Sequence, residues 1–355
     1  MKTREEIDER NAKAKKKYAE TLVVQTFDER DREYPKTDMG NAQQLAERYQ
    51  DLLRWGEKCW WKYDGSKWVK SDETAVRALA QVMVQEWYAF DRPYAHECSD
   101  IRKLNAMVNL TKDALPLQET FNTQSHLFNC ANGTIDLRTG ELQEHNPLDF
   151  FTQISPVAYE PDFQLPEFDS YLQTVTGGDP AIALYLQKLA GMTLLGRLPE
   201  RGFYVVIGPK GSGKSTFAEA LRAMSGDFGK VANFKETFGR KMANGGPSPA
   251  IARLEGARMI VCDEVPDREP IEDDLVKLFS AGGKVVARGL YTSHVDFEAT
   301  ATLLLMCNEA PAFNITDTAL WDRSRFVRFP YTIPRNDRDL TLPRRLTFPC
   351  TCPHA

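Results

Sequence analysis

Residues 203–226 read FYVVIGPKGSGKSTFAEALRAMSG, and the expected fold follows from this stretch. Its first five residues are aromatic or β-branched, which predicts a short buried strand. The glycine-rich segment that follows has the spacing G-x-x-x-x-G-K-S, and the residues behind it favour a helix. This order of strand, loop and helix is typical of a phosphate-binding loop in an α/β domain.

The predicted loop offers several contacts to a polyphosphate. Its glycines allow successive backbone N–H groups and the start of the helix to face the phosphates. Lys214 can reach the β- and γ-phosphate oxygens, and Ser215 can ligate Mg²⁺. Because no N-K-x-D string for guanine recognition occurs in the sequence, we expect ATP and Mg²⁺ as cofactors. The residues expected to bind ATP are Gly208, Pro209, Lys210, Gly211, Ser212, Gly213, Lys214, Ser215 and Thr216.

A second apolar run, residues 259–262, ends in Asp263 and Glu264. In a buried parallel sheet the carboxyl ends of the strands share one edge, so we expect these acids near the phosphate loop. Asp263 would hold the Mg²⁺, and Glu264 would polarise the water that attacks the γ-phosphate. An apolar run that ends in two acids is by itself more often an ordinary strand end. Its position after a phosphate loop favours the catalytic interpretation.

A third apolar run, residues 302–307, ends in Asn308. The amide of Asn308 could orient the attacking water, although the same residue taken singly would be a loop cap. Downstream, Arg323 and Arg325 flank the start of another apolar run. An arginine of this kind can complete the ATP site of a neighbouring subunit, whereas a surface ion pair is the commoner role. We expect Arg323 to be the catalytic arginine and leave Arg325 as the alternative.

Between the second and third apolar runs lies a basic segment that follows a pair of glycines and resembles a hairpin. Its candidate contacts to a nucleic-acid backbone are Lys284, Arg288 and His294. The net charge of −5 excludes a uniformly basic nucleic-acid coat. A local basic groove or the lumen of a ring is compatible with that charge.

The remainder of the chain divides by composition into further segments, and a length of 355 residues predicts roughly two domains. Residues 1–40 carry ten basic and ten acidic side chains, which predicts a charged helix and linker. Residues 41–165 predict a mostly helical domain with a hairpin at Asp64-Gly65, which three tryptophans flank. Residues 166–334 would form the ATPase domain, and residues 335–355 a short tail without apolar periodicity.

The three tryptophans are Trp60, Trp61 and Trp68. Together with Trp55 they form a cluster that could stack on bases or pack inside the small domain. Packing is the favoured interpretation. Seven scattered cysteines, an odd number, indicate a reducing compartment rather than a disulfide framework. No apolar run approaches the roughly 18 residues of a membrane helix, and the first residues lack the apolar core of a signal peptide. We therefore expect a cytoplasmic protein without a membrane partner.

The motif order resembles that of superfamily III helicases, specifically the phage and plasmid replication helicases of the poxvirus primase-helicase type. The resemblance covers a phosphate loop, an Asp-Glu strand, a hairpin after paired glycines, a strand ending in Asn and a W-x-R motif, over about residues 202–331. Upstream, residues 126–147 read HLFNCANGTIDLRTGELQEHNP and look like part of that family's N-terminal domain. The resemblance therefore spans most of residues 41–331.

The resemblance implies an α/β fold, with an AAA+-like motor domain around a central parallel sheet, preceded by a mostly helical domain with β-hairpins. It implies an ATP-dependent DNA helicase or translocase that acts on single-stranded and forked DNA as a homo-oligomer, a hexameric ring. Lys214, Ser215, Asp263, Glu264 and Asn308 would form the ATP site, with Ser215 and Asp263 as metal ligands. Arg323 would act on the neighbouring subunit, and the segment from Lys284 to His294 would touch DNA. A separate primase or origin-binding protein is a further candidate partner, and a phage-encoded chain would work in the host cytoplasm.

Two other functions share the same motifs. The alternative is an AAA+-like ATPase that remodels proteins or acts as a switch without unwinding DNA. A small-molecule kinase with a phosphate loop is less compatible, because Glu264 would have no water to activate and Arg323 no neighbour to serve.

Overall fold

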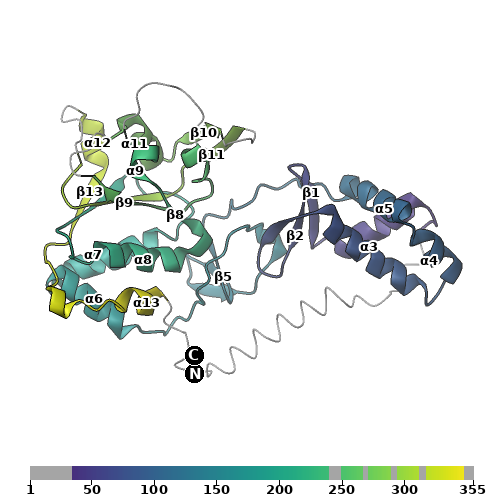
Figure 1. The fold of residues 1–355 in the computed structure, drawn as a ribbon, viewed down its shortest axis with the longest axis horizontal. Helices are drawn as coiled ribbons and strands as arrows, with labels where there is room; N and C mark the ends of the chain where they lie inside the picture. Colours follow the sequence, from purple (N-terminus) through teal and green to yellow (C-terminus); the bar gives the residue numbers. More distant parts are fainter. Residues whose placement is uncertain (1–33, 240–248, 267–270, 289–293, 312–316, 348–355) are drawn as a thin grey trace. The chain divides into compact units, whose positions relative to one another are not determined.

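The computed structural model describes residues 34–239, 249–266, 271–288, 294–311 and 317–347 (Figure 1). These residues form two compact units, one comprising 34–123 and 144–152, the other 124–143 and 153–347. Among the described residues, no helix combines the length and the apolar character needed to span a bilayer.

The first unit is mostly helical, and each of its helices begins at a capping side chain. Thr37, Asp72, Asp91 and Asp100 each accept a hydrogen bond from a backbone N–H in the first turn of the helix that follows. The helices are α2 (Asp38–Tyr49), α3 (Glu73–Trp87), α4 (Arg92–Cys98) and α5 (Ile101–Ala114). A short 3-10 helix, η2 (Pro147–Asp149), belongs to the same unit.

The predicted tryptophan hairpin lies in an antiparallel sheet of three strands in this unit. The strands are β1 (Leu53–Gly56), β2 (Cys59–Tyr63) and β3 (Trp68–Ser71). Trp60 and Trp68 are only 0% and 1% exposed, and Trp61 is buried as well. The packing interpretation is therefore confirmed for these three tryptophans, since buried rings cannot stack on bases. Trp55 is half-buried, and the centre of its ring lies 5.3 Å from that of Trp60.

A second small sheet is formed by the stretch of residues 126–147 that the sequence assigned to the N-terminal domain. Its strands are β4 (Leu127–Cys130), β5 (Gly133–Asp136) and β6 (Glu141–Gln143). In the structure this sheet is part of the second unit. The guanidinium of Arg258 holds it there by donating hydrogen bonds to the carbonyl oxygens of Gln124 and Leu127. The compact units therefore divide the chain at other positions than the expected boundary near residue 165.

The core of the second unit is a parallel sheet with the strand order β13-β7-β12-β9-β8. Its strands are β7 (Phe203–Ile207), β8 (Gly229–Val231), β9 (Met259–Val265), β12 (Thr302–Cys307) and β13 (Ser324–Arg328). All three apolar runs of the sequence lie in this sheet, and the predicted fold class is confirmed. Because the strands are parallel, their carboxyl ends meet at one edge.

Helices cover both faces of the sheet (Figure 1). Phe203 and Val205 of β7 pack in the cluster on one face, whereas Tyr204 and Val206 pack on the other. This alternation explains why the strand is apolar throughout. One face is covered by α6 (Pro166–Thr176), α7 (Pro180–Met192), α8 (Lys214–Ser225) and α13 (Leu342–Thr347). The other is covered by α9 (Phe234–Thr237), α10 (Pro249–Ala252), α11 (Asp273–Ser280) and α12 (Thr318–Arg323).

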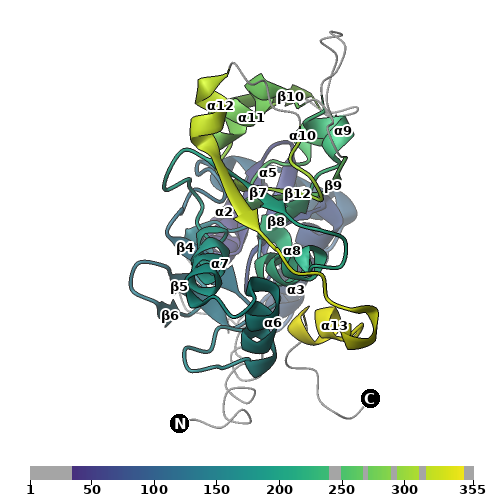
Figure 2. The ribbon, with the colours of Figure 1, turned by 90° about the vertical axis from the view of Figure 1, so that its left-hand side faces the viewer.

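The remaining described elements are short. A hairpin of β10 (Lys284–Arg288) and β11 (His294–Glu298) follows α11. The 3-10 helices η3 (Gly226–Phe228) and η4 (Arg335–Asp337) follow α8 and β13. The C-terminal residues, expected as a tail, fold as η4 and α13, and Leu346 joins the core cluster with α6 and α8. Figures 1 and 2 show α13 beside α6.

Candidate nucleotide-binding site

The phosphate loop lies between β7 and α8, as the sequence predicted. Gly211 and Gly213 have φ values of +78° and +94°, and Gly213 caps α8. At Gly213 a Cβ would lie 2.7 Å from Val175 Cγ1 of α6. The position therefore requires glycine both for its backbone conformation and for the close approach of α6.

Helix α6 is attached to the loop by Tyr171, a residue that sequence reasoning did not select. The Tyr171 hydroxyl donates a hydrogen bond of 2.8 Å to the Gly213 carbonyl oxygen. Burial raises the pKa of this hydroxyl well above its usual value, so it remains a donor at neutral pH. A tyrosine at helical spacing in an apolar face carries no local signal of such a role, because core tyrosines have the same pattern.

Lys214 points back into its own loop. Its Nζ donates to the carbonyl oxygens of Gly208 at 2.6 Å and Pro209 at 3.0 Å. The Asn308 Oδ1 lies 3.4 Å from the same ammonium group. Burial lowers the pKa of Lys214 from its ordinary value. The structure therefore brings Lys214 and Asn308 together, and anionic phosphate oxygens would be stronger acceptors for this ammonium than the carbonyls.

Asp263 and Glu264 lie within β9, which continues to Val265 instead of ending at residue 262 as expected. Cys262 pairs with Leu305 and Val265 pairs with Cys307, so β9 has one residue more than β12 over this step. This β-bulge coincides with the two acids, and bulges redirect side chains at the edges of sheets. Asp263 is exposed directly after the buried Cys262. The side chain of Glu264 lies outside the described residues.

The strand order fixes the relation between these groups. Strand β12 lies between β7 and β9. Asn308 directly follows β12, the loop with Lys214 follows β7, and Asp263 lies in β9. All three strands are parallel and deliver these residues to the same edge. Neighbouring strands lie about 4.8 Å apart, so Asn308 is centrally placed between the loop and the acids.

The donor set suits Mg²⁺. This ion commonly takes one or two carboxylates, a hydroxyl and substrate phosphates, and keeps several waters. Asp263 and the exposed Ser215 supply a carboxylate and a hydroxyl of this kind. Among the described residues there is no cluster of three or more His, Cys, Asp or Glu side chains that could hold a metal without a phosphate ligand.

Arg323 lies away from this edge. It ends α12, and Ser324, the next residue, pairs with Phe203 at the amino end of β7. The phosphate loop follows the carboxyl end of β7, so Arg323 is at the opposite edge of the sheet from Lys214. Its Nη1 donates to the Lys277 carbonyl oxygen at 3.2 Å. Arg325 donates to the Asp322 carbonyl oxygen at 2.7 Å and lies 3.8 Å from Glu200.

The β10–β11 hairpin forms as predicted, with Arg288 paired to His294 at its end. The side chains of Arg288 and His294 lie outside the described residues. Lys284 is exposed at the other end, where its Nζ lies 3.9 Å from Asp296. The structure thus places one of the three candidate nucleic-acid contacts on an exposed surface that it shares with an acid.

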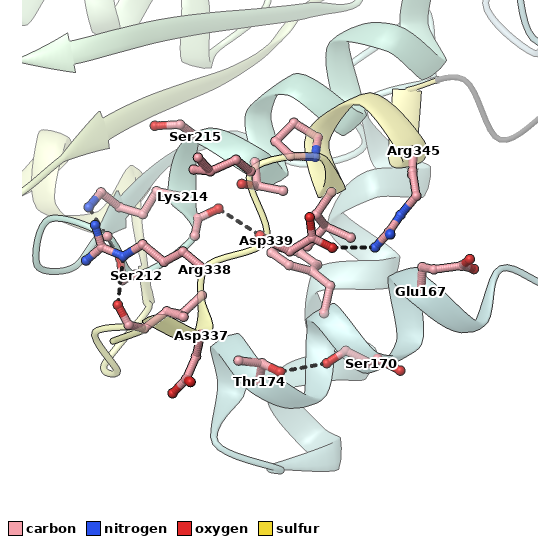
Figure 3. A pocket seen from close by; sticks show the side chains of 18 of the residues that line it. Glu167, Ser170, Thr174, Ser212, Lys214, Ser215, Asp337, Arg338, Asp339 and Arg345 are labelled. Carbon is pink, nitrogen blue, oxygen red and sulfur yellow. Dashed lines mark hydrogen bonds and ion pairs between the residues drawn. The ribbon is translucent and has the colours of Figure 1, made fainter. Parts of the chain in front are cut away.

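A cavity of about 860 Å³ borders the loop on the side of α6 (Figure 3). Its walls are α6, the loop and start of α8, and eight residues of the C-terminal segment between residues 333 and 345, namely Ile333, Asp337, Arg338, Asp339, Leu340, Leu342, Pro343 and Arg345. Sequence reasoning missed this segment as part of the site, because it contains neither a motif nor an apolar period.

Comparison with known proteins gives related sequences. The family described as D5 N terminal like matches residues 42–177. The putative helicase L207/L206 of Acanthamoeba polyphaga mimivirus is 24% identical over 327 residues, which cover 81% of this chain and 34% of that protein. The putative helicase 022R of Frog virus 3 is 27% identical over 158 residues, covering 43% of this chain and 16% of that protein.

Among solved structures, the apo structure of the NrS-1 C-terminal region (305–718) has a TM-score of 0.48 and 10% identity, over 83% of this chain and 63% of that chain. The chain spans about a third or less of the length of the two viral relatives.

Proposed function

We propose that this chain, which is related to superfamily III-like helicases of the primase-helicase type, is the ATP-hydrolysing part of a DNA helicase or translocase. The relationship, expected from the motif order, is confirmed by the D5 N-terminal-like match and the viral putative helicases. The observation that carries the proposal is the shared sheet edge, where the Lys214 ammonium lies 3.4 Å from the Asn308 amide oxygen and β9 delivers Asp263.

Each group at this edge has a role in the proposed hydrolysis. Lys214 and the loop N–H groups would hold the β- and γ-phosphates of ATP. Ser215 and Asp263 would hold Mg²⁺, which neutralises charge on the phosphates when bound. Glu264 would accept a proton from the attacking water, and Asn308 would orient that water beside the γ-phosphate.

The position of Arg323 supports assembly into a ring. At the opposite edge of the sheet from Lys214, this arginine is poorly placed for the ATP site of its own chain. In a hexameric ring it would instead stabilise the transition state in the adjacent subunit's site. The β10–β11 hairpins would then touch one DNA strand, with Lys284, Arg288 and His294 on the phosphate backbone.

An ATPase assay on size-separated oligomers, with and without single-stranded DNA, tests this proposal. We expect turnover to rise with DNA and with protein concentration until rings form. Glu264→Gln should bind ATP without hydrolysing it. Glu236→Gln, an exposed acid on α9, is the matched control and should hydrolyse ATP normally. Normal turnover by the Glu264 variant would refute the catalytic assignment.

The same assay separates the alternative function. Turnover that does not respond to DNA, together with no strand separation on a forked substrate, would identify an AAA+-like protein remodeller or switch. Such a result would agree with the proposed ATP site and would refute the proposal that the protein moves along DNA.

A further inference from the structure

The C-terminal segment, residues 333–345, is attached directly to the phosphate loop. The Ile333 N–H donates a hydrogen bond of 3.0 Å to the Gly211 carbonyl oxygen. Arg338 Nε in turn donates to the Ile333 carbonyl oxygen at 2.8 Å. The segment is thus held at the loop by a backbone hydrogen bond, and its own Arg338 side chain supports the residue that makes this bond.

These contacts place the Arg338 guanidinium on the loop. A Cβ at Gly211 would lie 2.1 Å from Arg338 Nη2 and 3.1 Å from Nη1, so the guanidinium lies against Gly211 of the loop. Arg338, Ser212 and Lys214 all line the cavity that Figure 3 shows. Two cations of the same chain therefore lie at the loop, an arrangement that favours a polyanionic ligand.

The cavity lies where a nucleoside would follow the phosphates. Lys214 marks the β- and γ-phosphate end of the loop, and the cavity borders Ser215 and Thr216, further along α8. Its volume of about 860 Å³ falls in the range of small-molecule sites. Tyr171, Leu342 and Pro343 contribute apolar surface to the wall. Leu340 also borders the cavity although it is 88% exposed, and an aromatic base would cover it.

The wall also contains three acidic side chains, Glu167, Asp337 and Asp339, of which Asp339 is paired within the segment. Asp339 Oδ2 accepts a hydrogen bond of 2.6 Å from Arg345 (Figure 3). Its other oxygen accepts a hydrogen bond from the Thr341 hydroxyl. Its charge is therefore compensated within the segment.

We propose that residues 333–345 complete the nucleotide site of their own chain, with Arg338 binding the phosphate chain and the cavity between this segment and α6 receiving the nucleoside. The inference rests on the proposed function, because it assumes that the Lys214 loop binds ATP. It assigns a part of the site that no motif in the sequence marks.

The proposal that the cavity receives the nucleoside is tested by a substitution that places a larger side chain in the cavity. Ser170 lies on the exposed face of α6 that lines the cavity, whereas Gln173 is exposed on the same helix and does not line it. We expect Ser170→Trp to weaken Mg–ATP binding by about 100-fold or more and to leave inorganic tripolyphosphate binding within about twofold, measured by calorimetry. Gln173→Trp should bind both ligands like the unmodified chain.

The arginine is tested with the same two ligands. Arg338→Ala removes a charge-assisted hydrogen bond to phosphate, so we expect both ATP and tripolyphosphate to bind about tenfold or more weakly. Arg335→Ala changes the same residue type three positions earlier, outside the cavity wall, and should bind both normally.

The outcomes distinguish the inference from the proposed function. If the unmodified chain binds ATP and loses it on Lys214→Ala, but Ser170→Trp and Arg338→Ala bind ATP normally, the C-terminal segment has no part in the site and the inference is wrong. If the unmodified chain binds no ATP, the proposed function itself fails.

Discussion

Arg258 offers a quantitative test of how the second unit is held together. It lies just before β9, is 3% exposed, and donates to the carbonyl oxygens of Leu127 at 2.7 Å, Leu194 at 2.8 Å and Gln124 at 3.2 Å. Its guanidinium also lies 4.6 Å from the centre of the Phe228 ring. Burial lowers the pKa of Arg258 to about 9, which leaves the group charged at neutral pH.

Arg258→Lys keeps the charge, so the cost of burying it remains. The ammonium group of lysine cannot reproduce the planar set of N–H donors of a guanidinium. We therefore expect only one of the three carbonyl oxygens to keep its hydrogen bond. The loss of two hydrogen bonds from a charged donor, each about 1.5–3 kcal/mol, should lower the free energy of unfolding by about 3–6 kcal/mol. Arg253→Lys is the control, because this arginine is exposed and should change stability by less than about 0.5 kcal/mol.

Hydrogen–deuterium exchange under native conditions measures the effect unit by unit. A loss of about 4 kcal/mol corresponds to roughly a thousandfold faster exchange of the slowest amides in β4, β5 and β7. Because the contacts of Arg258 described above lie in the second unit, exchange in α3 and α5 is the internal reference. A change below about 1 kcal/mol, or an equal loss in both units, would refute the role given to this side chain.

Two further changes test local electrostatics and the placement of the arginine finger. The Arg138 guanidinium holds the pKa of the Asp136 carboxyl well below its usual range, so this contact stabilises the fold above about pH 3.9 and is lost as the pH falls further. Asp136→Asn should therefore flatten the acid side of the stability curve between about pH 5 and 2, measured by urea unfolding; an unchanged slope would contradict this. Asp317 caps α12 and pairs with Lys277, whose carbonyl oxygen accepts from Arg323. Asp317→Ala should displace Arg323 and lower ATP turnover in rings by about tenfold or more, with ATP binding by monomers retained; equal losses of both would instead indicate general misfolding.

The three central strands β7, β12 and β9 and the loop after β7 could be predicted because their signals are local. A parallel strand is buried on both faces, so it appears as a short apolar run, and the phosphate loop needs its glycines and Lys214 in consecutive positions. The bulge at Asp263 could not be predicted, since it depends on how β9 pairs with β12. The roles of all the candidate site residues, from Lys214 and Asp263 to the hairpin cations, remain predictions.

Two features were decided only by contacts between residues far apart in the sequence. Residues 124–143 belong to the second unit because Arg258, more than 100 positions away, pairs with their carbonyl oxygens. Residues 333–345 border the phosphate loop because Ile333 bonds to Gly211. A backbone hydrogen bond requires no particular side chain, and a buried arginine is recognised only with its acceptors in place. The sequence alone therefore determined the phosphate loop, the central strands and the family pattern that they follow, whereas the tertiary structure decided which segments enclose the candidate site.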